Sequence, residues 1–319
     1  MKKDQPKIII SESRDFSNGV IEMLKEHARV DVRECSYEDL PYAFKEYDVF
    51  WFRLAHPIDD NILNGDLRCK FIVTPVTGLD HIDIELCNEK GIQVISLNGE
   101  TEFLKNVRAT AELTVALTLA LYRNIIPAAE SVLKGEWKRD LFRGHELYGK
   151  TAGIIGVGRL GKIVAGYFKA FGMNLIGYDI ADEYDVERMK KADSIEELLE
   201  KSDIVSLHVN YNEETKHLIS ENEFSYFKND SILINTSRGG VIDEKALLAA
   251  LEKNKIMGAA LDVVQDEFNF SEDNLLVEYA NRNNNLLIIP HIGGNTYESF
   301  EKTERFLAEK LIDRLKTIN

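Results

Sequence analysis

The sequence predicts an α/β protein made of two doubly wound parallel sheets. Short β-rich runs alternate with polar helical segments along most of its 319 residues, and strands that alternate with helices form parallel sheets. The length suits two domains of ordinary size. A glycine-rich turn at residues 156–161 opens a second series of strands and helices, which indicates where the second sheet begins.

The first hundred residues contain five predicted strands. They are Lys7–Ile10, Val30–Cys35, Asp48–Arg53, Phe71–Val76 and Ile92–Ser96, with Ile21–His27 and Ile58–Asn64 among the helical segments between them. A longer helical pattern follows, because apolar residues recur every three or four positions at Leu104, Val107, Ala111, Val115 and Leu119. Residues 135–149 are expected to form an irregular connector.

The second series begins at Thr151, and its predicted strands are residues 152–156, 174–179, 203–209, 231–236, 257–264 and 285–290. One helix between them starts at the capping box Ser194 to Glu197, and another starts after Asp243. A last helix spans residues 297–316. This order predicts one domain from residues 1–102 and 297–319 and another from 103–296. The long helix after Glu100 and the last helix would carry the chain from one domain to the other.

The glycine turn itself predicts a dinucleotide site. Gly156 permits a tight turn after an apolar strand, Gly158 lets the backbone approach a pyrophosphate, and Gly161 lets the next helix pack on the strand. That helix begins at Arg159 and Leu160, where free N–H groups and the positive end of the helix dipole favour an anion. An ordinary strand–helix turn is the alternative interpretation.

An acid after the next strand supports this interpretation. Asp179 lies 18 residues after Gly161, near the spacing expected of a carboxylate that bonds the adenosine ribose hydroxyls. A 2′-phosphate would be repelled by this carboxylate. The sequence therefore predicts NAD rather than NADP as the cofactor.

Composition excludes several classes of function. The net charge is −15 and no basic stripe offsets it, which argues against binding nucleic acid or an anionic membrane. Cys35, Cys69 and Cys87 fit neither a disulfide framework nor metal-ligand spacing, so we expect buried thiols and no metal site. A signal-type apolar core and a membrane-length apolar segment are both missing from the sequence, which predicts a cytoplasmic protein.

Three polar segments directly follow strands of the second series. They contribute Arg238, Glu267 and His291. Carboxyl ends of parallel strands share the edge of the sheet where ligands of α/β proteins bind, so we expect these side chains near the glycine turn. Each also has a simpler interpretation: a turn arginine paired with a surface acid, a solvated acid, and a histidine that caps a strand end.

Together these residues suit hydride transfer between NAD and a 2-hydroxy acid. Arg238 can clamp the substrate carboxylate and the reacting oxygen by charge-assisted hydrogen bonds. His291 can exchange the hydroxyl proton, and a nearby Glu267 would orient the ring and favour its protonated form. Asp262, near the end of the strand that leads to Glu267, could accept a hydrogen bond from the nicotinamide carboxamide.

Several of these motifs resemble one family. They are Gly156–Gly161 with Asp179, Asn235–Gly239, Leu261–Val263 with Glu267, and Pro290–Gly294. They resemble the NAD-dependent D-isomer-specific 2-hydroxyacid dehydrogenases, in the branch of phosphoglycerate dehydrogenase, over nearly the whole chain. The resemblance implies a Rossmann NAD domain inserted in a flavodoxin-like substrate domain, and an Arg–Glu–His site. It also implies a small anionic 2-hydroxy or 2-oxo acid as substrate, and a homodimer formed through the NAD domain.

The resemblance also implies roles for further residues. The backbone N–H groups of Thr77 and Gly78 match those that hold the substrate carboxylate. Arg53 matches a position that binds more highly charged substrates, and a solvated strand-end arginine is the alternative. Thr236 and Asp262 match positions near the nicotinamide amide.

Some positions depart from the family pattern, and other functions stay open. Asn210 stands where the family usually has proline near the adenine, and residues 98–112 are longer than the common spacing. A formate- or phosphite-type dehydrogenase shares the fold, although the formate type usually has glutamine at the position of Glu267. An NADH-sensing co-repressor without enzymatic activity is the other alternative. Which 2-hydroxy acid is the substrate stays open.

Overall fold

A computed structural model describes residues 5–181 and 186–318. The described chain divides into two compact units. Met1–Val107 and Asn295–Asn319 form one, here called the discontinuous unit, and Arg108–Gly294 form the inserted unit. The sequence predicts boundaries after residues 102 and 296, and the units of the structure divide after Val107 and Gly294.

In the described part of the discontinuous unit, five parallel strands form a sheet in the order β2-β1-β3-β4-β5. They are β1 (Lys7–Ile10), β2 (Arg29–Val32), β3 (Val49–Trp51), β4 (Phe71–Val73) and β5 (Gln93–Ile95). Each starts within one residue of its prediction. This order is flavodoxin-like and reverses between β1 and β3, which is the point where ligands bind in such sheets.

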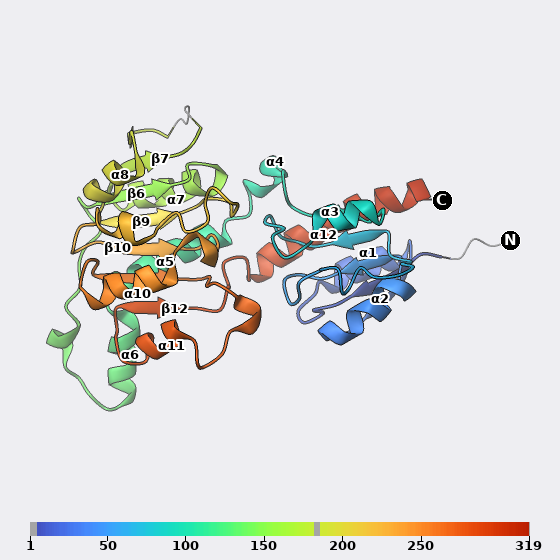
Figure 1. Ribbon diagram of the computed structural model, residues 1–319, viewed down its shortest axis with the longest axis horizontal. Helices are drawn as coiled ribbons and strands as arrows, with labels where there is room; N and C mark the ends of the chain where they lie inside the picture. The colour runs from blue at the N-terminus through green and yellow to red at the C-terminus, as the bar shows by residue number, and fades with distance from the viewer. Residues whose placement is uncertain (1–4, 182–185, 319) are drawn as a thin grey trace. The chain divides into compact units, whose positions relative to one another are not determined.

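Helices cover both faces of this sheet. On one face lie α1 (Asn18–Lys25), α4 (Thr101–Leu104) and α12 (Tyr297–Ile318); on the other lie α2 (Leu40–Glu46), after the 3₁₀ turn η1 (Tyr37–Asp39), and α3 (Ile84–Glu89). Successive strand residues point to opposite faces, so Ile8 and Ile10 pack toward α1 and α12 while Ile9 packs toward α2. The last helix therefore completes the core of the first strands, and it packs beside α1 (Figure 1).

Two of the helix predictions are wrong. Residues 58–64 form turns, because the Asp59 carboxylate accepts hydrogen bonds from the N–H groups of Asn61 and Ile62 and so competes with helical bonding. Ile58 instead bridges to Ile82.

The long helix predicted after Glu100 is the second error. It is broken into α4 and α5 (Ala109–Tyr122) by a tight turn in which Lys105, Asn106 and Val107 donate to carbonyls three residues earlier. The boundary between the units lies at this turn.

Within the described residues of the inserted unit, seven parallel strands form a sheet in the order β12-β11-β10-β9-β6-β7-β8. They are β6 (Thr151–Ile155), β7 (Asn174–Tyr178), β8 (Met189–Lys191), β9 (Ile204–Leu207), β10 (Ile232–Asn235), β11 (Gly258–Leu261) and β12 (Leu286–Ile288). The order reverses between β6 and β9, as in a Rossmann fold. The two doubly wound sheets confirm the predicted fold class.

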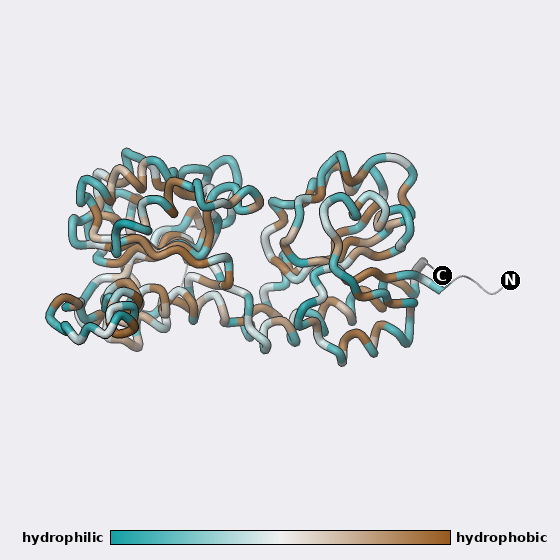
Figure 2. The backbone as a smooth tube through the Cα atoms, turned by 90° about the horizontal axis from the view of Figure 1, so that it is seen from below, coloured by the Kyte–Doolittle hydropathy of each residue, from teal (hydrophilic) through white to brown (hydrophobic). Residues whose placement is uncertain are grey.

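Helices also cover both faces of the second sheet. On one face lie α5 and α7 (Arg159–Ala170); on the other lie α8 (Ile195–Lys201), α9 (Glu221–Phe224), α10 (Glu244–Glu252) and α11 (Leu275–Ala280). Figure 2 shows hydrophobic residues along the strands between these layers. Ser194 and Asp243 cap α8 and α10 as predicted. The connector after α6 (Ile125–Leu133) is irregular apart from a 3₁₀ turn, η2 (Arg139–Phe142).

The three cysteines are buried and free, as expected. Burial raises the pKa of the Cys69 thiol to about 12 and that of Cys87 to about 11, so both thiols stay protonated and unreactive. Of the helices that the structure describes, none combines the length and apolar composition needed to cross a membrane.

Candidate active site

The glycine turn after β6 fits a dinucleotide pyrophosphate. Gly156 has φ +89°, and a Cβ there would lie 2.5 Å from the carbonyl oxygen of His208. A Cβ on Gly161 would lie 2.0 Å from the carbonyl oxygen of Gly156, so α7 packs tightly on the turn. At Gly158, by contrast, no heavy atom of the described chain lies within 4 Å of the added Cβ. The protein itself requires the first and third glycines, whereas the second leaves space that a ligand could fill.

The first turn of α7 supplies the other features expected of an anion site. Arg159 and Leu160 are its first residues, and the leading N–H groups of a helix have no partner within the helix. The partly buried Leu160 side chain packs on the core, so its backbone N–H is the polar group that it offers to a ligand. The Arg159 guanidinium is partly buried, and burial lowers its pKa.

Asp179 follows β7 and is held against the glycine turn. Its Oδ2 accepts the N–H of Val157 at 2.6 Å, and its Oδ1 accepts the N–H of Ala181 at 2.9 Å. A carboxylate can accept about four hydrogen bonds. Within the described residues, two positions are therefore left for hydroxyl groups such as those of a ribose.

His208 lies across the switch point from the glycine turn, directly after β9. Its Nε2 pairs with the Oγ of Ser206 at 2.8 Å, and its Nδ1 is buried without a hydrogen-bond partner in the described part of the chain. Burial lowers the pKa of His208 from 6.5 to about 3. The folded protein thus keeps this ring neutral.

Acid is expected to destabilise the protein through His208. Because the pKa is lower in the folded state, only the unfolded state binds a proton between about pH 6.5 and pH 3, and stability falls as the pH drops through this window. From pH 7 to pH 5 the loss from this group is about 2 kcal/mol. Urea unfolding of the wild type and of His208→Asn at both pH values would measure it. Equal pH dependence in the two proteins would contradict the assignment.

Three strand ends meet at one edge of the inserted sheet, as predicted. Asn235, Leu261 and Ile288 are register partners that end β10, β11 and β12. The hydrogen bonding continues beyond them, because the Asp262 N–H donates to the Asn235 carbonyl at 2.9 Å and the His291 N–H donates to the Asp262 carbonyl at 2.8 Å.

The turn that carries Arg238 touches the segment that leads to Glu267. A Cβ on Gly239 would lie 1.9 Å from the carbonyl carbon of Val264 and 2.4 Å from the nitrogen of Gln265. Only glycine allows the two backbones to approach this closely, so the contact fixes the two turns against each other.

The structure brings His291 and Glu267 together. The His291 Nδ1 lies 2.7 Å from the Glu267 Oε2, and the other carboxylate oxygen accepts the Val264 N–H at 3.3 Å. Glu267 begins a short 3₁₀ turn, η4 (Glu267–Asn269). Both side chains are partly exposed, and with Nδ1 engaged the Nε2 of His291 is left to meet a reactant.

Asp262 holds the turn that carries His291. Its side chain is buried, and its two oxygens accept the N–H groups of Ile292 at 2.7 Å and Gly293 at 2.9 Å. Burial raises the pKa of Asp262, while these donors and His291 act in the opposite direction. This positioning role did not follow from the sequence, and the predicted contact with the nicotinamide amide stays a prediction.

Arg238 and Thr236 lie in a tightly bonded turn after β10. The buried Asn235 donates from its amide to the Arg238 carbonyl at 2.9 Å, and its Oδ1 accepts from the N–H and the hydroxyl of Ser237. The Arg238 Nη1 donates to the Ser237 carbonyl at 2.9 Å. Thr236 is buried, with its hydroxyl 2.9 Å from that of Thr114 in α5.

In the discontinuous unit, Thr77 and Gly78 lie in the loop after β4. Among the described residues their N–H groups have no hydrogen-bond acceptor, so both are available to an anion. The Thr77 carbonyl accepts from the Asn98 amide at 3.0 Å, which ties the loop to the segment after β5.

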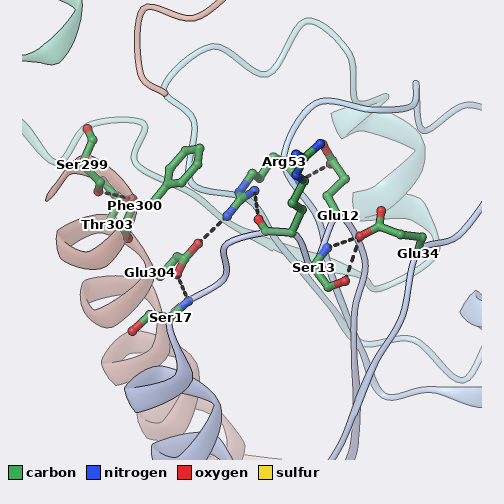
Figure 3. A network of polar contacts seen from close by, with 10 residues as sticks. Glu12, Ser13, Ser17, Glu34, Arg53, Ser299, Phe300, Thr303 and Glu304 are labelled. Carbon is green, nitrogen blue, oxygen red and sulfur yellow. Dashed lines mark hydrogen bonds and ion pairs between the residues drawn. The ribbon is translucent and has the colours of Figure 1, made fainter. Parts of the chain in front are cut away.

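Arg53, directly after β3, is mostly buried, so its interpretation as a solvated arginine is wrong. Its Nη2 donates to Glu304 Oε1 at 2.8 Å, and its Nη1 donates to the Arg14 carbonyl at 3.0 Å (Figure 3). Its guanidinium carbon lies 3.9 Å from the ring centre of Phe300. Burial raises the pKa of Glu304, while Arg53 and the N–H of Ser17 act in the opposite direction.

Comparison with known proteins finds a matching family and several similar proteins. Residues 115–293 match the D-isomer specific 2-hydroxyacid dehydrogenase, NAD binding domain. The chain is 36% identical to D-3-phosphoglycerate dehydrogenase of Methanocaldococcus jannaschii over 96% of its own length, and it spans 56% of that longer protein. It is 35% identical to glyoxylate reductase of Thermococcus gammatolerans, over 97% of this chain and 92% of that protein. The structure of D-lactate dehydrogenase from Aquifex aeolicus, complexed with NAD and lactic acid, superposes with a TM-score of 0.84 at 29% identity, covering 98% of this chain and 95% of that one.

Proposed function

Because the chain belongs to the family of D-isomer specific 2-hydroxyacid dehydrogenases, we propose that His291, Glu267 and Arg238 carry out its reaction. The reaction is the NAD-dependent interconversion of a 2-hydroxy acid and its 2-oxo acid. When bound, NAD(H) would supply the hydride for reduction and accept it in oxidation.

The observation that carries the proposal is the 2.7 Å contact between His291 Nδ1 and Glu267. A carboxylate that accepts from one ring nitrogen fixes the tautomer and the orientation of the ring. The opposite nitrogen, Nε2, then donates its proton to the reacting carbonyl oxygen during reduction and takes it back from the hydroxyl during oxidation. Asp262 keeps the His291 turn in place throughout.

Substrate binding is assigned to Thr77, Gly78 and Arg238. The N–H groups of Thr77 and Gly78 have no acceptor in the described chain and would bind the substrate carboxylate. Arg238 would bind the carboxylate and the reacting oxygen through charge-assisted bonds. Thr236 and Asp262 are assigned to the neighbourhood of the nicotinamide amide.

A panel of 2-oxo acids would test the proposed function. NADH oxidation should be followed with glyoxylate, pyruvate, hydroxypyruvate and larger sugar-derived oxo acids, and NAD reduction with formate and phosphite. Turnover of at least one 2-oxo acid supports the proposal. Turnover of formate or phosphite alone would favour those dehydrogenases, and no turnover with any compound would favour an NADH-sensing co-repressor.

We propose NAD rather than NADP as the preferred cofactor, on the strength of Asp179. Asp179→Ala is expected to lower the ratio of kcat/KM for NADH over NADPH by about tenfold or more, because it removes a negative charge that repels the 2′-phosphate. Asp230→Ala, which removes an exposed acid before β10, is the matched control and should leave the ratio unchanged. An unchanged ratio in Asp179→Ala would reject the ribose contact.

We also propose a homodimer formed through the inserted unit. Leu133 is 87% exposed and Trp137 is 86% exposed, and Leu141 and Tyr148 nearby are exposed as well. Large exposed apolar side chains close together in one segment are typical of a protein interface. Sedimentation velocity should give twice the mass of the chain, and a monomer would exclude the proposal. The cytoplasmic location expected from the sequence stays a prediction.

A further inference from the structure

Arg53 occupies the switch point of the discontinuous sheet, beside the loop that holds Thr77 and Gly78. It follows β3, whose neighbours are β1 and β4. The Phe52 N–H donates to the Val73 carbonyl at 3.0 Å, and the Thr74 hydroxyl donates to the Arg53 carbonyl at 3.0 Å. The loops that follow β3 and β4 are therefore hydrogen-bonded to each other where they begin, at the edge of the sheet where ligands bind.

The positive charge at this position has a buried counter-charge. Glu304 of α12 is fully buried: its Oε1 accepts from Arg53 at 2.8 Å and its Oε2 accepts the Ser17 N–H at 2.9 Å (Figure 3). A second carboxylate, that of Glu12, accepts the backbone N–H of Arg53 at 2.5 Å. The guanidinium side chain is only 15% exposed.

This arrangement weakens the attraction that Arg53 could offer to a ligand anion. A phosphate that approached the guanidinium would also be repelled by Glu304, whose charge lies within a few ångströms and is poorly screened because it is buried. Each terminal nitrogen of Arg53 already donates one hydrogen bond to a protein oxygen. Strong recognition of a phosphate uses an open pair of guanidinium donors, so a phosphate would have to share the Arg53 guanidinium with Glu304.

We propose that Glu304 determines substrate specificity: by compensating the charge of Arg53, it makes this chain select 2-oxo acids that carry no second anionic group over phosphorylated ones. The inference rests on the proposed function and adds the substrate class. Arg53 then shapes the site as part of a neutral pair, held in position by Glu304 and stacked on Phe300.

The test uses two substrates that differ only in one phosphate group. Hydroxypyruvate and 3-phosphohydroxypyruvate should be compared with NADH, and the ratio of their kcat/KM values is the readout. We expect the wild type to favour hydroxypyruvate. Glu304→Gln, which keeps the shape and an acceptor oxygen for Ser17, should shift the ratio toward the phosphorylated acid by at least about tenfold, the effect expected of one nearby charge.

The double variant Arg53→Gln/Glu304→Gln is the matched control. It removes both charges and so restores neutrality, and its ratio should return toward that of the wild type. A loss of selectivity caused only by disturbed packing would instead persist in the double variant. A wild type that prefers the phosphorylated acid, or a folded Glu304→Gln with an unchanged ratio, would overturn the proposal.

A binding measurement separates this inference from the proposed function. Thermal unfolding with increasing inorganic phosphate should stabilise Glu304→Gln more than the wild type, whether or not either protein turns over an oxo acid. Absence of turnover with every acid would count against the proposed function alone. Equal phosphate stabilisation of both proteins would count against the role of Glu304.

Discussion

Replacing His291 by alanine is expected to lower kcat by about 10²–10⁴-fold, the usual contribution of a general acid or base. The binding of NADH should be nearly unchanged, because the glycine turn and Asp179 lie on other strands of the sheet. The loss comes from the proton that Nε2 would exchange with the reacting oxygen. Glu267 is assigned to act through the His291 ring, which its Oε2 contacts, so its carboxylate loses that role when the ring is removed.

Steady-state rates with NADH and the best 2-oxo acid, together with NADH binding followed by fluorescence, would measure both effects. His27→Ala is a suitable control, because His27 is exposed in the discontinuous unit and should leave kcat unchanged. Turnover near that of the wild type in His291→Ala would remove His291 from the acid/base role.

Replacing Gly239 by alanine is expected to lower the free energy of unfolding by about 3 kcal/mol and to abolish most turnover. The added Cβ would lie 1.9 Å from the carbonyl carbon of Val264. Backbone cannot yield as a flexible side chain can, so the Arg238 turn must move away from the segment that leads to Glu267. Stability and catalysis should therefore fall together.

Gly166→Ala is the matched control for this variant. Gly166 lies inside α7, and no heavy atom of the described chain would lie within 4 Å of its Cβ. Alanine there should raise stability by up to about 1 kcal/mol, because glycine is a poor helix former. Urea unfolding of both variants would show opposite signs. A Gly239→Ala protein as stable and active as the wild type would show that the two turns do not need their close contact.

The contact between His291 and Glu267 could be expected from the sequence because it depends on topology. Strands of one parallel sheet bring their carboxyl ends to one edge, and the polar residue after each strand follows it there. The role of Asp262 could not be predicted. Its carboxylate bonds backbone N–H groups 30 residues away, and a backbone donor leaves no signature in the side chains. The helical spacing of apolar residues in α12 likewise gave no sign that Glu304 would be buried against Arg53.

The errors in the strand predictions also have physical causes. β2, β3 and β4 end two or three residues before the predicted strands do, since the chain leaves the sheet to form loops such as the one that carries Thr77. β8 escaped prediction because Lys190 and Lys191 make it polar, as is common for a strand at the edge of a sheet. The turn at residues 58–64 was missed since a single carboxylate, Asp59, overrides a helical apolar pattern.

The position of α12 has a consequence for synthesis on the ribosome. The first strands emerge early, yet Leu307, Leu311 and Leu315, which complete their core, are translated only after the roughly 190 residues of the inserted unit; at typical elongation rates this delay is about 10–40 s. The inserted unit can fold during that delay, while the apolar face of the early strands lacks the part of its cover that α12 provides. Newly made chains should therefore expose part of this core until α12 has been made.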